Sequence, residues 1–162
     1  MANKYNAKKK GKNDSGMEYD FTQYLKSKGI VFQEQVIFNL QEKFEKNGKK
    51  YQAIDYKADF QVCDVVIDIK GFVTTDFAIK KKLFEYKYSH LTLKCVRAVP
   101  KWVVACFNCN WIELDEEKKL KKIVNKFKKE NNYKIMNAKY VTEDLIAEIN
   151  KKVKFYEILK GE

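Results

Sequence analysis

Two aspartates and a lysine, Asp59, Asp68 and Lys70, stand in a stretch whose residues alternate between apolar and polar types. The alternation predicts two β-strands within residues 56–71, joined by a tight turn at Cys63-Asp64. A turn at that position sets the two aspartates directly opposite each other on one face of the hairpin. Lys70, two residues beyond Asp68, projects from the same face. The spacing therefore brings three charged side chains together.

The other face of this hairpin is wholly apolar in the predicted register. Val62 lies opposite Val65, Phe60 opposite Ile67, and Ala58 opposite Ile69. A slip of one position would turn the charges toward the core, so the register is well specified. On the charged face the further opposed pairs are Gln61 with Val66 and Lys57 with Lys70.

Directly opposed aspartates repel each other, because their Cβ atoms are ~4.5–5.5 Å apart. A divalent cation removes the repulsion, and Mg²⁺ takes one or two carboxylates while keeping several waters. Lys70 can hold a metal-bound water or offset charge on a phosphorane-like transition state. Metal, activated water and cation are the parts that phosphodiester hydrolysis requires. The alternative is a solvated hairpin face, since Asp-x-Lys triplets also arise by chance.

The charge of the chain points to a polyanionic partner. Its formal net charge is +11, and of its 33 basic residues only Arg97 is an arginine. Lysine binds phosphate as a point charge, without the planar fork that reads guanine edges, so we expect contacts to the backbone of a nucleic acid. A general bias toward lysine is the alternative. Residues 1–13 carry Lys8, Lys9 and Lys10 among five lysines and no acid, which is typical of a disordered basic arm.

The elements that position the hairpin can be predicted from capping and periodicity. Ser15 and Glu18 have the spacing of a capping box, and apolar residues then recur at helical intervals until Gly29. Residues 30–45 favour an extended chain, and Asn47-Gly48 predicts a hairpin. We expect the strands of that hairpin to be Gln41–Lys46 and Lys49–Ile54. The other predicted elements are helices at 76–88, 115–129 and 142–152 and strands at 91–99, 101–106 and 138–141.

Asp59, the eight-residue gap and Asp68-Ile69-Lys70 resemble the D-x(n)-(D/E)-x-K motif of the PD-(D/E)XK nuclease superfamily. Glu18, on a helix before the strands, is similar to the first acid of phage T7-type endonuclease I and of archaeal Holliday-junction resolvases. Blocks at 1–9, 56–60, 69–71 and 78–84 also resemble small phage proteins regarded as such resolvases. The resemblance covers roughly residues 1–95. Ala58 stands where the motif has its proline.

The resemblance implies an α/β, restriction-endonuclease-like fold with a mixed β-sheet flanked by helices. It implies that Glu18, Asp59 and Asp68 are ligands of Mg²⁺ or Mn²⁺ and that Lys70 is the catalytic lysine. The expected activity is hydrolysis of branched DNA by a homodimer. The lysines expected to contact DNA are Lys8, Lys9, Lys10, Lys57, Lys80, Lys81, Lys82 and Lys87.

Three parts are expected along the chain: the basic arm at 1–13, a nuclease core at 14–105, and a helical extension at 106–162. The chain lacks an apolar stretch long enough to span a membrane, so we expect a cytoplasmic protein, in the host cell if it is phage-encoded.

Cys106 and Cys109 form a CxxC, but a second pair is missing, and we expect buried thiols rather than zinc. Two other readings stay open: a non-catalytic nucleic-acid-binding protein, and a flap or single-strand nuclease of the same fold.

Overall fold

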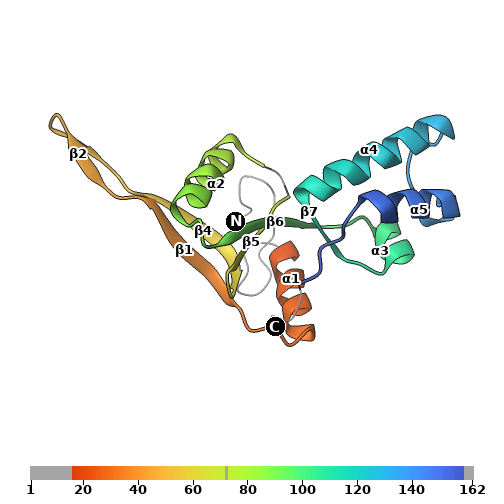
Figure 1. Ribbon diagram of the computed structural model, residues 1–162, viewed down its shortest axis with the longest axis horizontal. Helices are drawn as coiled ribbons and strands as arrows, with labels where there is room; N and C mark the ends of the chain where they lie inside the picture. The colour runs from red at the N-terminus through yellow and green to blue at the C-terminus, as the bar shows by residue number, and fades with distance from the viewer. Residues whose placement is uncertain (1–15, 72, 159–162) are drawn as a thin grey trace. The chain divides into compact units, whose positions relative to one another are not determined.

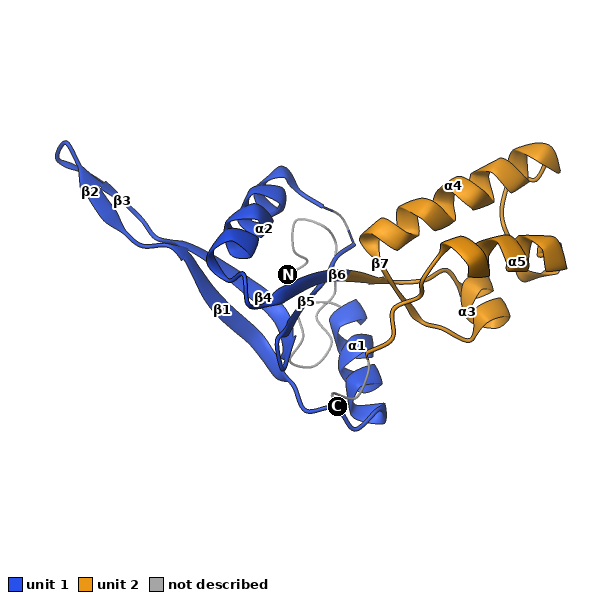
Figure 2. Ribbon diagram, in the orientation of Figure 1, with its two compact units in different colours: residues 1–95, 160–162 blue, residues 96–159 orange. Residues whose placement is uncertain are grey.

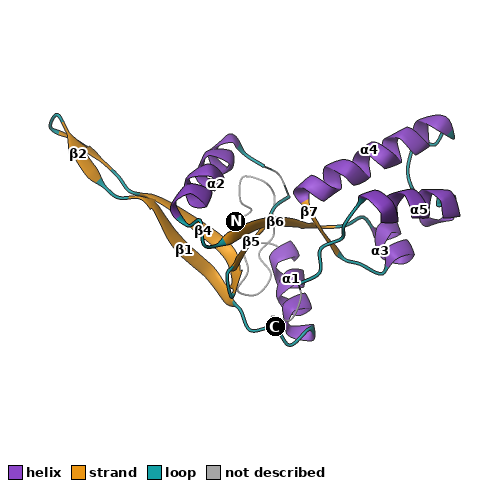
Figure 3. Cartoon of the chain, viewed as in Figure 1, coloured by secondary structure: helices purple, strands orange, loops and turns teal. Residues whose placement is uncertain are grey.

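A computed structural model describes residues 16–71 and 73–158 (Figure 1). One helix is followed by five strands, and helices then alternate with the last two strands (Figure 3). The elements, in chain order, are α1 (Gly16–Ser27), β1 (Gln33–Gln41), β2 (Phe44–Lys46), β3 (Lys49–Tyr51), β4 (Ile54–Val62), β5 (Val65–Ile69), α2 (Thr75–Lys87), β6 (Thr92–Ala98), α3 (Lys101–Phe107), β7 (Trp111–Glu113), α4 (Leu114–Glu130), the 3₁₀ turn η1 (Ala138–Tyr140) and α5 (Glu143–Lys152).

Five strands form one mixed sheet in the order β1-β4-β5-β6-β7, and β2 and β3 form a separate two-stranded sheet. Pairing is antiparallel between β1 and β4, β4 and β5, and β6 and β7. The helix α2 connects β5 to its neighbour β6, the type of connection that a crossover in a sheet requires. The predicted α/β class, a mixed sheet flanked by helices, is confirmed.

The chain divides into two compact units at Cys95 and Val96 (Figure 2). In the first unit, alternate residues of β4 form the surface on which both helices pack. Phe21 of α1 contacts Phe60, with ring centroids 5.2 Å apart, and Phe84 of α2 contacts Tyr56 at 5.6 Å. Ala58, between these two, is fully buried. The alternation that predicted the strand therefore also forms the core of this unit.

The predicted hairpin at Asn47-Gly48 is confirmed, with shorter strands than expected. Both turn residues have positive φ, 53° and 72°, as the tight turns that join hairpin strands require. The ladder pairs Phe44 with Tyr51 and Lys46 with Lys49. It extends the β1–β4 pair as a narrow ribbon (Figure 1). Every residue of β2 and β3 is exposed.

The second unit has a core of its own, in which α3, α4 and α5 surround β7. Leu120, Ile123 and Val124 form the predicted apolar stripe of α4 and are buried. Leu145 and Ile149 of α5 pack in the same cluster. The remaining buried members of this cluster are Val99, Val103, Cys109, Ile112 and Val153.

Two predicted strands are wrong. Lys101–Phe107 is the helix α3, which begins after Pro100, whose carbonyl accepts hydrogen bonds from Val103 and Val104. A short apolar run does not distinguish a strand from a helix turn buried on one side. The second, at 138–141, is the 3₁₀ turn η1, whose first turn is capped by the Asn137 side chain.

The other predicted helices and strands are confirmed to within a few residues. Thr74 and Thr142 cap α2 and α5, each accepting a hydrogen bond from a backbone N–H three residues on. Strand β7 was not predicted. In the part of the chain that is described, no helix is both long enough and apolar enough to cross a membrane.

Candidate active site

The hairpin of β4 and β5 has the predicted register. Phe60 pairs with Ile67, Gln61 with Val66, and Val62 with Val65. The turn places Cys63 at a φ of 50°, in the left-handed region. Pairing ends at Phe60 and Ile67, so the ladder stops before it reaches the two aspartates.

Asp59 reaches across to β5 through its side chain. Its Oδ2 accepts a hydrogen bond of 2.6 Å from the backbone N–H of Ile69. This contact lies where the strands are no longer paired, and it satisfies a backbone donor next to Asp68. Asp59 is half-buried. The carboxylate of Asp59, in the interior of β4, thus contacts the end of β5 beside Asp68.

Asp68 is buried to a degree that is rare for an aspartate. It is 1% exposed, and its Oδ2 lies 2.8 Å from the Nζ of Lys70. The Tyr56 hydroxyl and the Lys70 ammonium both interact with this carboxylate, although neither is aligned as a full hydrogen bond. A buried carboxylate with so few donors is costly, because these contacts do not fully replace the lost water. Asp68 therefore keeps acceptor capacity beyond its contacts with Tyr56 and Lys70.

Lys70 lies between Asp68 and the helix α2. Its Nζ is 4.6 Å from the ring centroid of Phe77, which is a cation–π distance. Its side chain keeps 26% of its surface exposed. The ammonium group thus contacts the buried acid and the aromatic ring while remaining open to solvent.

Glu18, which sequence reasoning placed by resemblance, lies near these residues. It is buried at 8% exposure on the first turn of α1. Its charge is among those that raise the pKa of Asp59. Met17, its neighbour, packs at the end of β5, where a Cβ on Gly71 would meet the Met17 Cε at 3.4 Å. The start of α1 and the end of β5 therefore meet, and the four predicted site residues gather in one place.

The environment favours the protonated form of Asp59. Burial and the charge of Asp68 raise the pKa of Asp59 to about 8, and the charge of Glu18 adds to this. The hydrogen bond from Ile69 and the charge of Lys70 oppose the increase without cancelling it. Burial is the largest cause, so the charged form of Asp59 is disfavoured mainly because the carboxyl is removed from water.

Tyr56 is a member of this site that the sequence did not reveal. Burial, followed by the charge of Asp68, raises its pKa, so its hydroxyl stays protonated. Its buried hydroxyl interacts with the Asp68 carboxylate, which also raises the pKa of Tyr56 through this hydrogen bond, although the contact is not well aligned. Tyr56 occupies an alternate, core-facing position of β4, which is the pattern of a packing residue. Nothing in the local sequence distinguished Tyr56 from an ordinary packing residue.

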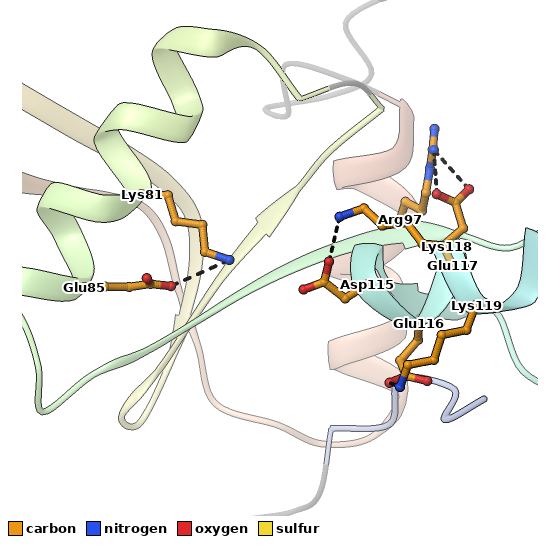
Figure 4. A network of polar contacts seen from close by, with 8 residues as sticks. All are labelled: Lys81, Glu85, Arg97, Asp115, Glu116, Glu117, Lys118 and Lys119. Carbon is orange, nitrogen blue, oxygen red and sulfur yellow. Dashed lines mark hydrogen bonds and ion pairs between the residues drawn. The ribbon is translucent and has the colours of Figure 1, made fainter. Parts of the chain in front are cut away.

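The lysines expected to contact DNA fall into three groups. Lys8, Lys9 and Lys10 lie outside the described residues. Lys57 is exposed on β4. On α2, Lys80 and Lys81 are half-buried and make ion pairs of 3.7 and 3.6 Å with Asp76 and Glu85, and the second pair is drawn in Figure 4. Of the other two, Lys82 is exposed, and Lys87 donates a hydrogen bond to Asn39.

The donor set fits a hard divalent cation. In residues 16–71 and 73–158, no three acidic, histidine or cysteine side chains converge closely enough to complete a coordination sphere. Mg²⁺ needs only one or two carboxylates, because it keeps several waters. Asp59 and Asp68 are the two carboxylates that could supply them, and Asp68 already contacts one cation, the ammonium group of Lys70. The CxxC has a different character: burial and the charge of Glu157 raise the pKa of Cys109 to about 11.

The chain matches the sequence profile of one family. The profile describes proteins of unknown function (DUF1064) and matches residues 2–104, from the N-terminal arm through β1, the two hairpins and α2 into α3. No curated protein and no solved structure matches the chain. The matched residues make up more than half of the sequence and include Glu18, Asp59, Asp68 and Lys70. The chain therefore belongs to the DUF1064 family of proteins of unknown function.

Proposed function

We propose that this protein is a metal-dependent DNA endonuclease with a restriction-endonuclease-like fold. The observation that carries the proposal is the carboxylate of Asp68. It is 1% exposed, lacks well-aligned donors among the described residues, and stands beside a second acid whose pKa is raised to about 8. A fold keeps such a costly group when the group has a ligand or a reaction to serve.

Asp59 and Asp68 are the residues that would hold Mg²⁺ or Mn²⁺, and Glu18 lies close enough to contribute through its charge. When bound, the cation lowers the pKa of a coordinated water and neutralises charge on a phosphate oxygen. The chain's own groups do the remaining work. Asp59 holds the end of β5 against β4 by accepting a hydrogen bond from the backbone N–H of Ile69, next to Asp68.

Lys70 supplies the positive charge that acts on the phosphate or on the attacking water. Its ammonium group is held by Asp68 at 2.8 Å and by the ring of Phe77, and it is partly open to solvent. A group so placed can donate to a phosphate oxygen or orient a water, and the low-dielectric surroundings strengthen either contact. Tyr56 adds a protonated hydroxyl close to Asp68.

The excess of lysine favours DNA as the substrate, bound through its phosphates. Lys80 lies one helical turn beyond Phe77, whose ring Lys70 contacts, so α2 carries positive charge beside the acids. Branched DNA and a homodimer are the expected substrate and assembly, and both follow from the resemblance to junction resolvases. Binding should weaken steeply with salt, because each phosphate contact releases counterions.

The test is cleavage by the purified full chain. Four-way junctions, flaps, single strands and linear duplex are incubated with Mg²⁺ or Mn²⁺, with the wild type and with Asp68→Asn. We expect the wild type to cut branched DNA and Asp68→Asn to bind the same junction without cutting it. Cutting of flaps or single strands in preference to junctions would keep the nuclease but replace its substrate.

A non-catalytic nucleic-acid-binding protein is the second candidate, favoured by the net charge of +11. The same experiment separates the two. If the wild type binds DNA in a salt-sensitive way but cuts none of these substrates with either metal, the nuclease proposal is wrong and the binding protein remains.

A further inference from the structure

The ribbon formed by β2 and β3 presents aromatic rings outside either core. Phe44 and Tyr51 are cross-strand partners whose ring centroids lie 4.6 Å apart at an interplanar angle of 4°. They are 44% and 38% exposed. In the described part of the chain their ring contacts are with each other and with Lys49, whose Nζ is 5.2 Å from the Tyr51 centroid.

Stability alone does not account for this arrangement. A cross-strand aromatic pair supports a short hairpin, but an isolated two-stranded ribbon gains little by exposing large rings to water. The first unit has buried positions for aromatics, as Phe60 and Phe84 demonstrate with 1% and 0% exposure. Large exposed apolar side chains that cluster mark surfaces for binding.

The ribbon is also strongly basic. Between Lys43 and Gln52 there are four lysines and one acid, Glu45. Lys43, Lys50 and Gln52 line an open hollow of about 460 Å³ together with Glu45 and the two aromatic residues. Lysines interleaved with aromatic rings are the composition of surfaces that hold a nucleic-acid strand, because the cations contact phosphates and the rings stack on bases.

We propose that the β2–β3 ribbon binds single-stranded DNA, with an unpaired base stacked at the Phe44–Tyr51 pair and its phosphates on Lys43 and Lys50. The rings favour an unpaired strand over duplex, because the faces of bases in a duplex are covered by their neighbours. The absence of arginine from the ribbon favours backbone contacts over reading of base edges. The inference rests on the proposed function only in its choice of DNA, and it narrows the substrate to branched or flapped DNA with an unpaired segment.

The test measures binding without cleavage. The affinity of the full chain for a fluorescent dT 20-mer and for a duplex 20-mer is measured by anisotropy in EDTA. Phe44→Leu keeps an apolar partner for Tyr51 but removes the stacking face. We expect it to weaken binding to the single strand roughly five-fold or more and to leave duplex binding unchanged. The matched control, Tyr86→Leu, removes an exposed ring of α2, outside the ribbon, and should bind the dT 20-mer like the wild type.

The lysines have a separate readout. The double variant Lys43→Gln/Lys50→Gln should reduce the slope of log affinity against log salt for the dT 20-mer by about 1.4, since each phosphate contact contributes about 0.7 on single strands. Lys134→Gln/Lys151→Gln removes two exposed lysines of the second unit and should leave that slope unchanged. Equal changes in the two double variants would indicate an effect of overall charge and would overturn the assignment.

A deletion variant tests whether the weaker single-strand binding of Phe44→Leu comes from local misfolding of the ribbon. Gln41 pairs with Ile54, so residues 42–53 can be replaced by Asn-Gly, which closes β1 and β4 with a tight turn. We expect this variant to fold and to lose single-strand binding. Unchanged binding to the dT 20-mer in both the deletion and Phe44→Leu would overturn the proposal. Cleavage plays no part in this test. If the protein never cuts DNA but passes the test, the nuclease proposal is wrong and the proposal of single-strand binding by the ribbon stands.

Discussion

Carboxylates gather in two regions of this molecule, and the two regions treat them differently. In the first unit, Asp59 of β4 lies beside the end of β5 that carries Asp68, and the pKa of Asp59 is raised to about 8. In the second unit, Asp115, Glu116 and Glu117 occupy the first turn of α4, where a helix dipole favours negative charge. Glu116 has a pKa below its usual value, because Lys119 and the backbone N–H of Lys154 donate to it.

Each acid at the start of α4 has a cation in contact. The Nη1 of Arg97 donates to both carboxylate oxygens of Glu117, at 3.0 and 3.1 Å (Figure 4). Lys118 contacts Asp115 at 2.8 Å, and Lys119 contacts Glu116 at 2.6 Å. Asp68 has Lys70 and no well-aligned donor in the described residues. The acids of α4 serve stability, whereas those of the hairpin cost stability, and the cost is what points to function.

The comparison predicts opposite results for the same chemical change in the two regions. Asp68→Asn should reduce metal-dependent DNA cleavage by at least about 100-fold if Asp68 is the metal ligand that we propose. Glu116→Gln, its counterpart on α4, should cut at the wild-type rate. The measurement is the single-turnover rate on the preferred branched substrate. Equal activity of the two variants would contradict the separation of the regions.

The pH dependence of stability should differ between the regions as well. Asp59 has a folded pKa of about 8 and an unfolded pKa near 3.8, so between these values the folded state keeps a proton that the unfolded state has lost. In EDTA the free energy of unfolding should therefore fall as the pH rises from 5 to 8, by at most about 1.4 kcal/mol per pH unit from this group. Asp59→Asn should remove that decrease. Urea titrations of both proteins across this range provide the measurement.

The contribution of Glu116 to the free energy of unfolding changes with pH in the opposite direction to that of Asp59. Its lowered pKa means that its contribution is present above the unfolded value of 4.5 and is lost as the pH falls through the folded value. Glu116→Gln should flatten the acid limb of the stability profile and leave the range from pH 5 to 8 as in the wild type. If Glu116→Gln changed the free energy of unfolding only between pH 5 and 8, the assignment of the acid limb to Glu116 would be contradicted.

The pair of Arg97 and Glu117 should carry a moderate part of the second unit's stability. Both side chains are mostly buried, with 26% and 15% exposed, and one guanidinium nitrogen of Arg97 donates to both oxygens of Glu117. Arg97→Gln should lower the free energy of unfolding by about 1–2 kcal/mol. Thermal unfolding measures this, and DNA cleavage at a temperature where the variant is folded should stay at the wild-type level.

The smallest effect is expected on α2. Lys80 and Asp76 form an ion pair of 3.7 Å between partly exposed groups, which is worth about 0.3–0.5 kcal/mol. Lys80→Gln should therefore leave the melting temperature almost unchanged while it weakens junction binding at low salt. A loss of stability without a loss of affinity would assign Lys80 to the fold rather than to DNA.

The sequence predicted the parts of this fold that are specified locally. The register of β4 and β5 follows from their alternation and from the turn at Cys63-Asp64, and α5 begins at the cap that Thr142 provides. The helix α3 and the strand β7 were missed, because a short apolar run takes its form from distant partners: β7 exists through its pairing with β6.

The candidate site was predictable as a set of residues but not as an environment. Asp59, Asp68 and Lys70 follow from spacing, and Glu18 required the resemblance to a nuclease family. The burial of Asp68 and the approach of Tyr56 depend on how α1 and α2 pack on β4, which no local pattern specifies. The same holds for the pKa of Asp59, since burial is its largest cause.

The most direct test of the central claim is calorimetric titration of Mn²⁺ into the wild type, Asp68→Asn and Glu116→Gln at pH 7.5, in two buffers of different ionisation enthalpy. The wild type and Glu116→Gln should bind Mn²⁺ and release close to one proton, because Asp59 is largely protonated at this pH and a ligand must lose its proton. Asp68→Asn should lose this binding. Failure of the wild type to bind Mn²⁺, or equal binding by all three proteins, would contradict a metal site at the hairpin.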